Sequence, residues 1–158
     1  MMENTMSTMR INHMELTFPE GALTAQKKQQ IGDFYQKLFD WNTLEIEIVD
    51  QKALLLMIDE EVSQFILCAE SPNPIHSPGY DHLGFLFETR DEVDALLSKC
   101  KAMQKENPDI QIKEYEDLVE GPTTVHAFYV KYLLPIWFDV QCIEYEPGTE
   151  PVKQWRYQ

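Results

Sequence analysis

The fold of this chain is decided by three short stretches of sequence: INHMEL at residues 11–16, YDHLGF at 80–85 and IWFDVQ at 136–141. In each stretch apolar and polar residues alternate with a period of two, which is typical of a β-strand that faces the core on one side only. The non-core faces carry His13, His82 and Asp139. Two imidazoles and a carboxylate on three strands are the donor set of a two-histidine, one-carboxylate metal site.

Length and composition restrict the class of protein. A chain of 158 residues, 44% of them hydrophobic, is large enough for one compact domain with a buried core. Its longest apolar run, residues 53–58, is far shorter than a membrane span, and its first ten residues lack the apolar segment of a signal peptide. The formal charge of −14 would repel nucleic-acid phosphates. We therefore expect no membrane or nucleic-acid partner; the charge permits a cationic ligand and also favours solubility.

The cysteines indicate a reducing compartment. Cys68, Cys100 and Cys142 are odd in number, show no C-x-x-C spacing, and each has apolar neighbours in the sequence. We expect buried, reduced thiols at such positions, and this predicts a cytoplasmic protein.

The chain repeats one order of elements around a central loop. Thr24 is a suitable N-cap for the first helix, whose apolar residues recur at helical spacing. The loop at 71–79 contains three prolines and a glycine. After it, Thr89 and Glu92 form a capping box for a second helix. The helices are predicted from Thr24 to about Phe39 and from Thr89 to just before Pro108, and the strands at 11–16, 43–49, 52–58, 63–70, 80–88, 110–114, 124–131 and 135–144.

Each half therefore has the order βαβββ. This predicts an α+β fold in which two βαβββ units form a curved mixed sheet around a cleft. The expected single domain covers residues 11–146, with units at 11–70 and 80–146. We expect residues 1–10 to be a flexible lead and residues 147–158 an arm that packs on its own domain or on a partner.

With these motifs in this order, the chain resembles the vicinal-oxygen-chelate superfamily. That superfamily includes glyoxalase I, fosfomycin-resistance enzymes, extradiol dioxygenases, methylmalonyl-CoA epimerase and bleomycin-resistance proteins. The resemblance covers roughly residues 10–146. The motifs that carry it are INH at 11–13, FYQKLFDW at 34–41, DHLGF at 81–85 and GPTT at 121–124, and FYQKLFDW is the most specific of them.

The resemblance implies a set of metal ligands. By position, His13 and His82 correspond to the two histidine ligands of the family. The acidic ligand of many members lies eleven residues after the first residue of a Phe-Tyr pair, and Phe128 places Asp139 at that point. Family members usually have Glu there, so the shorter Asp would shift the metal or bind it more weakly. The implied cofactor is a divalent ion: Fe, Mn, Zn or Ni.

Departures from the family pattern reduce the number of family activities that this chain could have. Glyoxalase I and the epimerase use a further Glu or Gln from the fourth strand, where this chain has Leu67, which cannot coordinate a metal. The extradiol dioxygenases use further histidines at positions that are Leu67 and Glu120 here. The fosfomycin enzymes share the three-ligand set, but basic, phosphonate-binding surroundings are not evident in so acidic a chain.

Further residues are assigned around the predicted metal. Glu15 shares a strand face with His13 and would be a general base if burial raised its pKa; otherwise it is an ordinary exposed carboxylate. Tyr129 is the second candidate for proton transfer. Trp137, Gln141 and Leu67 are expected to line the ligand cleft, although Trp137 would equally suit a dimer interface and Gln141 the rim.

Two functions remain open, and a third possibility is a member of the fold that has lost its activity. The first is a divalent-metal-dependent enzyme, not a typical glyoxalase I, that acts on a small oxygenated substrate chelated to the metal by lyase, isomerase or dioxygenase chemistry. The alternative is a bleomycin-resistance-like protein that binds a small molecule without catalysis; the acidic charge and the aromatic residues suit it. Because single-domain members of the superfamily often build their clefts from two chains, the resemblance also implies a homodimer.

Overall fold

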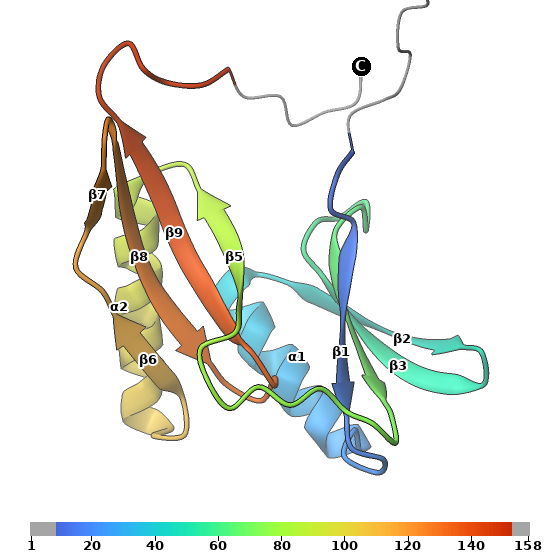
Figure 1. Cartoon of the computed structure of the whole chain (residues 1–158). Helices are drawn as coiled ribbons and strands as arrows, with labels where there is room; N and C mark the ends of the chain where they lie inside the picture. Colours follow the sequence, from blue (N-terminus) through green and yellow to red (C-terminus); the bar gives the residue numbers. More distant parts are fainter. Residues whose placement is uncertain (1–8, 153–158) are drawn as a thin grey trace, which may run out of the picture.

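The computed structural model describes residues 9–152 of the 158-residue chain. These residues form two similar halves, each with one helix and one sheet (Figure 1). The first half contains β1 (His13–Phe18), α1 (Ala25–Phe39), β2 (Asn42–Ile48), β3 (Gln51–Met57) and β4 (Phe65–Glu70). The second half contains β5 (His82–Phe87), α2 (Arg90–Glu106), β6 (Gln111–Glu114), β7 (Leu118–Glu120), β8 (Thr123–Lys131) and β9 (Trp137–Tyr145).

Both sheets have the same topology. The strand order is β1-β4-β3-β2 in the first sheet and β5-β9-β8-β6 in the second. In each sheet the first strand in the chain runs parallel to the last, and the other pairs are antiparallel. The α+β class and the two βαβββ units with mixed sheets are therefore as predicted.

The second half contains one strand that the sequence did not predict. β7 pairs antiparallel with β8 across a turn at Gly121, whose φ of 54° lies in the region that favours glycine. All three residues of β7 are exposed, so no apolar row marks it as a strand. The strands predicted at 124–131 and 135–144 are β8 and β9.

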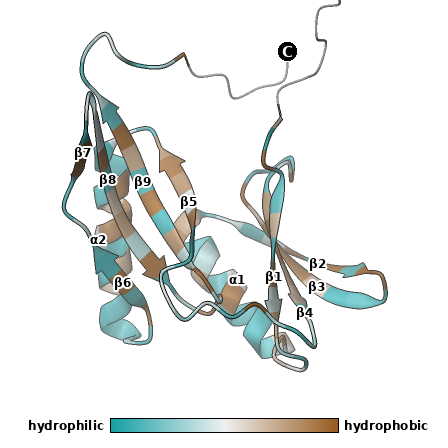
Figure 2. Ribbon diagram, in the orientation of Figure 1, coloured by the Kyte–Doolittle hydropathy of each residue, from teal (hydrophilic) through white to brown (hydrophobic). Residues whose placement is uncertain are grey.

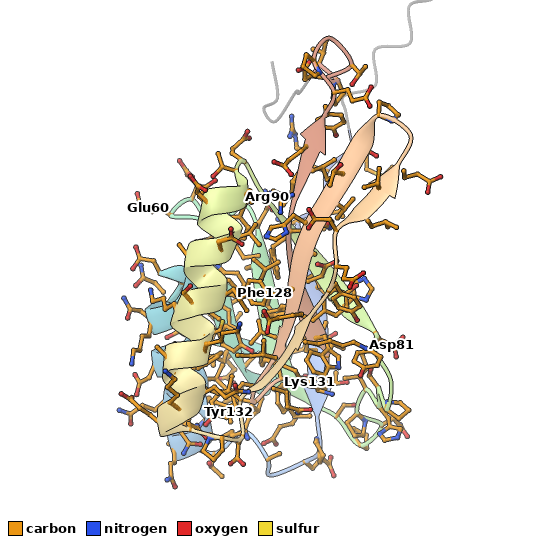
Figure 3. The ribbon with its side chains drawn as sticks, turned by 90° about the vertical axis from the view of Figure 1, so that its left-hand side faces the viewer. Glu60, Asp81, Arg90, Phe128, Lys131 and Tyr132 are labelled. Carbon is orange, nitrogen blue, oxygen red and sulfur yellow. The ribbon has the colours of Figure 1, made fainter. Side chains whose placement is uncertain are left out.

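The helices begin where the capping residues predicted. The Thr24 hydroxyl accepts a hydrogen bond of 3.1 Å from the backbone N–H of Lys27 at the start of α1. Thr89 and Glu92 form the complete capping box at the start of α2. α2 ends at Glu106, before Pro108, as expected. Figure 3 shows Arg90 and Tyr132 near the two ends of α2, with Phe128 between them.

One face of each sheet packs against a helix. α2 carries mostly hydrophilic residues, whereas β5 and β9 are richer in hydrophobic residues (Figure 2). An aromatic cluster joins the two halves: the ring of Trp41 lies 5.3 Å from that of Phe85 and 5.9 Å from that of Phe138, centroid to centroid. The Tyr35 hydroxyl also donates a 2.7 Å hydrogen bond to the carbonyl oxygen of Tyr132. The halves are thus held together through α1 and the aromatic residues that follow it.

The cysteines are buried and form no disulfide, as predicted. Burial raises the pKa of Cys68 and of Cys100 to about 12, so both thiols stay protonated and unreactive. Within residues 9–152, no helix combines the length and apolar character needed to cross a membrane. The predicted lead at 1–10 lies mostly outside the described residues, and so does the second half of the predicted arm at 147–158.

Each sheet ends in an edge strand on the side toward the other half. β1 is an edge of the first sheet and β5 an edge of the second, and the two do not contact each other in the described part of the chain (Figure 1). His13 and His82 are the first residues of these strands. The fold therefore puts the two predicted histidine ligands at the margins of two different sheets.

Candidate metal centre

Three strands of the second sheet bring predicted site residues onto one face. Tyr129 of β8 lies opposite Asp139 of β9, and Asp139 lies opposite Gly84 of β5. Along each strand, the side chains on this face alternate with those buried on the opposite face, toward α2. The other predicted residues on it are His82, Trp137 and Gln141. The second half therefore gathers its predicted site residues on the side of the sheet away from α2.

His82 is held in one ring orientation. Its Nδ1 lies 2.7 Å from the carbonyl oxygen of Tyr80, so we assign the ring proton to Nδ1, which donates it to that oxygen. Nε2 then carries a lone pair and lies 3.3 Å from the Tyr129 hydroxyl and 3.9 Å from Oδ2 of Asp139. An imidazole fixed by a carbonyl on its far side is the form in which histidine binds a metal.

Asp139 is a buried carboxylate with an unsatisfied oxygen. The residue is 7% exposed, and its Oδ1 has no hydrogen-bond partner within residues 9–152. Burial raises the pKa of Asp139, and the opposing effects of His82 and of the Tyr129 hydroxyl do not cancel this. Burial and the nearby Asp139 charge raise the pKa of Tyr129 to about 12, so its hydroxyl keeps its proton. A buried acceptor that lacks a donor destabilises the fold, and a bound cation would relieve it.

The ring of His13, on the first sheet, is held through Nδ1 in the same way as that of His82. Its Nδ1 lies 2.7 Å from Oδ1 of Asn12, an arrangement that leaves Nε2 as the acceptor, and its ring stacks on Phe65 with centroids 4.7 Å apart. Glu15 lies on the same face, opposite Leu67 of β4. Glu15 is exposed and Leu67 is half-buried. Within one chain, Glu15 therefore lacks the burial that its predicted role as a general base requires.

A single chain does not gather the three predicted ligands. Within residues 9–152, no group of three or more His, Cys, Asp or Glu side chains is placed to hold a metal ion. The structure brings His82 and Asp139 together, while His13 lies on the other sheet. Each half thus carries part of the predicted donor set at the margin of its own sheet.

Neighbouring side chains shape the surface around the His82–Asp139 pair. A Cβ atom at Gly84 would lie 3.1 Å from Nε2 of Gln141, so glycine leaves room for the Gln141 amide next to the pair. Trp137 is 8% exposed, and its ring lies 5.4 Å from that of Tyr80. Gln141 and Trp137 therefore lie on the same sheet face as the pair.

Three further residues border this face and were missed from the sequence. Lys113 of β6 is the register partner of Tyr129, and its ammonium lies over the rings of Tyr80 and Tyr115. The ring of Tyr115 in turn lies 4.7 Å from that of Tyr129. The alternation at residues 111–115 would have put Lys113 and Tyr115 on one side of a strand. It could not have shown that this strand lies beside β8.

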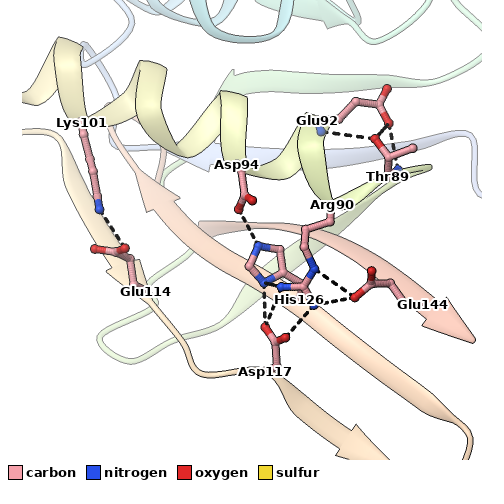
Figure 4. Close-up of polar contacts among 9 residues, drawn as sticks. All are labelled: Thr89, Arg90, Glu92, Asp94, Lys101, Glu114, Asp117, His126 and Glu144. Carbon is pink, nitrogen blue, oxygen red and sulfur yellow. Dashed lines mark hydrogen bonds and ion pairs between the residues drawn. The ribbon is translucent and has the colours of Figure 1, made fainter.

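A second cluster of charged side chains lies on the α2 side of the same sheet (Figure 4). Arg90 pairs with Asp117 at 2.6 Å and also with Glu144. The ring of His126 lies between Asp117, 2.7 Å from Nδ1, and Asp94, 2.7 Å from Nε2. Burial lowers the pKa of His126, but the hydrogen bonds to Asp117 and Asp94 outweigh it and the net shift is upward. Every ring nitrogen has a partner here, as expected of a structural histidine.

A cavity of about 970 Å³ lies between the two halves. Its walls include Phe39, Trp41, Phe85 and Leu96, together with residues 9–11. The predicted metal ligands do not line it. It is therefore a second, partly aromatic surface, separate from the His82–Asp139 pair.

Several solved structures share this architecture. The genomically encoded fosfomycin resistance protein FosX from Listeria monocytogenes aligns with a TM-score of 0.57 at 17% identity, over 83% of this chain and 91% of that chain. A glyoxylase/bleomycin resistance protein/dioxygenase domain from Frankia sp. EAN1pec aligns with a TM-score of 0.56 at 15% identity, over 90% and 96%. This chain has the vicinal-oxygen-chelate fold.

The likeness lies in the fold and hardly in the sequence. No family model and no curated protein sequence matches this chain. A FosX variant with Glu replaced by Gln, in complex with Mn(II) and 1S,2S-dihydroxypropylphosphonic acid, aligns with a TM-score of 0.55 at 17% identity, over 87% of this chain and 92% of that chain. At such identities the comparison extends to the architecture, and the site has to be argued from the residues of this chain.

Proposed function

We propose that this protein is a divalent-metal-dependent enzyme that acts on a small oxygenated substrate at the face carrying His82 and Asp139. The observation that carries the proposal is the buried Oδ1 of Asp139 without a hydrogen-bond partner, next to a histidine whose Nε2 is held as an acceptor. Uncompensated buried carboxylates are rare in proteins unless they bind a cation.

The donor chemistry of the pair fits a divalent ion. Two ligands that each bind a metal at about 2.1 Å are separated by at most about 4.2 Å, and by about 3 Å when they are at right angles. Nε2 of His82 and Oδ2 of Asp139, 3.9 Å apart, lie within that range. When bound, the ion would act as a Lewis acid on substrate oxygens. The Mn(II) seen with FosX makes Mn(II) the first ion to test.

The third ligand in this proposal is His13 of a second copy of the chain. β1 and β5 are edge strands that do not contact each other within one chain. A homodimer would let β1 of one copy approach β5 of the other, so that His13 joins His82 and Asp139. The same association would bury Glu15, which is the change that its role as a base requires.

The remaining roles follow from position. Tyr129, whose hydroxyl is protonated and 3.3 Å from Nε2 of His82, would donate a hydrogen bond to the substrate or deliver a proton. Trp137 and Gln141 would contact the substrate on the same face, and Leu67 would do so from the first sheet of the second copy. The buried thiols agree with a cytoplasmic location, which is part of the proposal.

Complementation between two defective chains tests both the ligand set and its division between copies. His13→Ala and His82→Ala chains should each fail to bind Mn(II). Mixed under conditions that allow subunit exchange, they should recover about a quarter of the wild-type sites, because half of the dimers are mixed and one of their two sites is intact. His82→Ala mixed with Asp139→Asn should recover nothing, since both changes lie in the same half. Equal recovery in the two mixtures, or none in the first, would reject the divided site.

The alternative is a binding protein without catalysis. The cavity of about 970 Å³ with walls that include Phe39, Trp41 and Phe85 favours it, since that cavity needs no metal. Ligand binding that is unaffected by a chelator and by Asp139→Asn would support this alternative and exclude the enzyme.

A further inference from the structure

Lys113 occupies an unusual position on the face of the proposed site. Its Nζ lies 3.8 Å from the ring centroid of Tyr80 and 5.1 Å from that of Tyr115. These three residues come from different elements: Tyr80 lies in the loop before β5, Lys113 in β6 and Tyr115 in the loop after β6. Cation–π contacts of this kind hold a lysine in place without neutralising its charge.

The electrostatic setting of Lys113 differs from that of the cations that form ion pairs. Lys28, Arg90 and Lys101 each contact a carboxylate within 2.8 Å. Within residues 9–152, no carboxylate forms an ion pair with Lys113. The Tyr80 hydroxyl raises the pKa of Lys113, so the ammonium stays charged at neutral pH.

Lys113 is aligned with the His82–Asp139 pair across the sheet. The register places Lys113 opposite Tyr129, and Tyr129 opposite Asp139, so the three share one row. Two strand spacings separate Lys113 from Asp139, or about 10 Å between backbones. Aromatic rings fill the interval: Tyr115 lies 4.7 Å from Tyr129, and Tyr129 lies 4.8 Å from His82, centroid to centroid.

We infer that Lys113 is the specificity-determining anchor for an anionic group on the substrate. This inference rests on the proposed function, whose substrate it narrows to small oxygenated compounds that carry a carboxylate or a phosphonate-type oxyanion. The oxygens that react lie at His82 and Asp139, and the oxyanion lies at Lys113, over the ring of Tyr129. A cationic ligand, which the net charge alone would permit, meets a like charge at this end of the site.

The test uses metal-free protein, so that its result is independent of the metal site. The probes are phenylphosphonate, benzoate and benzylammonium, followed by NMR titration. Lys113→Met should weaken binding of both anions about 10-fold, since a charge-assisted contact of this size is lost. Lys113→Arg should restore binding, and Lys101→Met, which removes a charge paired with Glu114 elsewhere, should have no effect. Benzylammonium should bind no more weakly to Lys113→Met than to the wild type.

The outcomes separate this inference from the proposed function. His82→Ala should keep anion binding in the metal-free protein while it loses Mn(II), and Lys113→Met should do the reverse. Unchanged anion binding in Lys113→Met would overturn the role of Lys113. So would preferential binding of benzylammonium by the wild type, or wild-type protein that binds neither anion at about 10 mM.

Discussion

Two histidines on opposite faces of the second sheet have opposite environments. His126 contacts Asp94 and Asp117 through its two ring nitrogens, and Arg90 bridges Asp117 to Glu144. The Nδ1 of His82 contacts the Tyr80 carbonyl, its Nε2 lies 3.3 Å from the Tyr129 hydroxyl, and the carboxylate beside it is buried with one unsatisfied oxygen. The first cluster is complete and joins α2 to the sheet. The second is incomplete, and this is the reason to regard it as a site.

The largest expected effect is on metal affinity. His82→Ala should weaken Mn(II) binding by about 100-fold or more, because it removes a direct ligand and changes of even supporting residues cost 10–100-fold. His126→Ala is a matched control, as is His76→Ala in the loop before β5, where His76 is exposed, and both should change the affinity less than about 3-fold. Isothermal titration calorimetry would measure all four proteins. Equal losses in His82→Ala and His126→Ala would show that the two histidines do not differ as proposed.

The next largest effect is on stability. Arg90→Met should lower the free energy of unfolding by about 1–2 kcal/mol, since it leaves Asp117 and Glu144 without their shared cation while keeping an unbranched apolar side chain. Lys101→Met removes one exposed pair with Glu114 and should cost less than about 0.5 kcal/mol. Urea denaturation with metal-free protein would compare them. A larger loss in Lys101→Met would show that the Arg90 cluster is not a principal stabilising contact.

A smaller effect is expected in the pH dependence of stability. The pKa of Asp117 is lowered to about 2, first by Arg90 and then by His126, so its stabilisation is present above about pH 4 and is lost as the pH falls toward 2. The pKa of His126 is raised, so its stabilisation is complete below about pH 6.5 and is lost as the pH rises through the folded-state pKa.

The pH prediction is checked with His126→Gln. Wild-type stability should fall as the pH rises above about 6.5, and the variant should show a flatter profile over the same range. Thermal unfolding at a series of pH values would record both curves. A variant that declines as steeply as the wild type would assign the pH dependence to another group.

The smallest effect is expected at Gly84. Alanine there would place Cβ 3.1 Å from Nε2 of Gln141, and the end of that flexible side chain would have to move. Gly84→Ala should therefore change stability by less than about 1 kcal/mol and reduce Mn(II) affinity by no more than about 10-fold. A fully unfolded variant would show that Gly84 is needed for the backbone rather than for space near Gln141.

Much of the fold could be predicted from local sequence. Thr24, Thr89 and Glu92 fix the helix starts through hydrogen bonds within a few residues, and the apolar alternation fixes which strand faces are buried. β7 was missed because its residues are all exposed and its pairing with β8 leaves no apolar pattern.

The candidate site was predicted only in part, because it depends on contacts between distant segments. Strand parity placed His82, Tyr129 and Asp139 on a non-core face, and the structure brings these three together. Lys113 reaches the same face through the pairing of β6 with β8, and Tyr80 through a loop. His13 lies on a separate sheet, and in the proposed function it reaches the pair from a second copy of the chain.

One measurement tests the central claim most directly: calorimetric unfolding of wild type, Asp139→Asn and His126→Gln at a fixed protein concentration, with and without Mn(II). Since a ligand that binds only the folded state raises the melting temperature, wild type should be stabilised by Mn(II). Metal-free Asp139→Asn should melt no lower than wild type, because it removes a buried charge, and should show no shift with Mn(II). His126→Gln should melt lower but keep the shift. A full Mn(II) shift in Asp139→Asn would contradict the account.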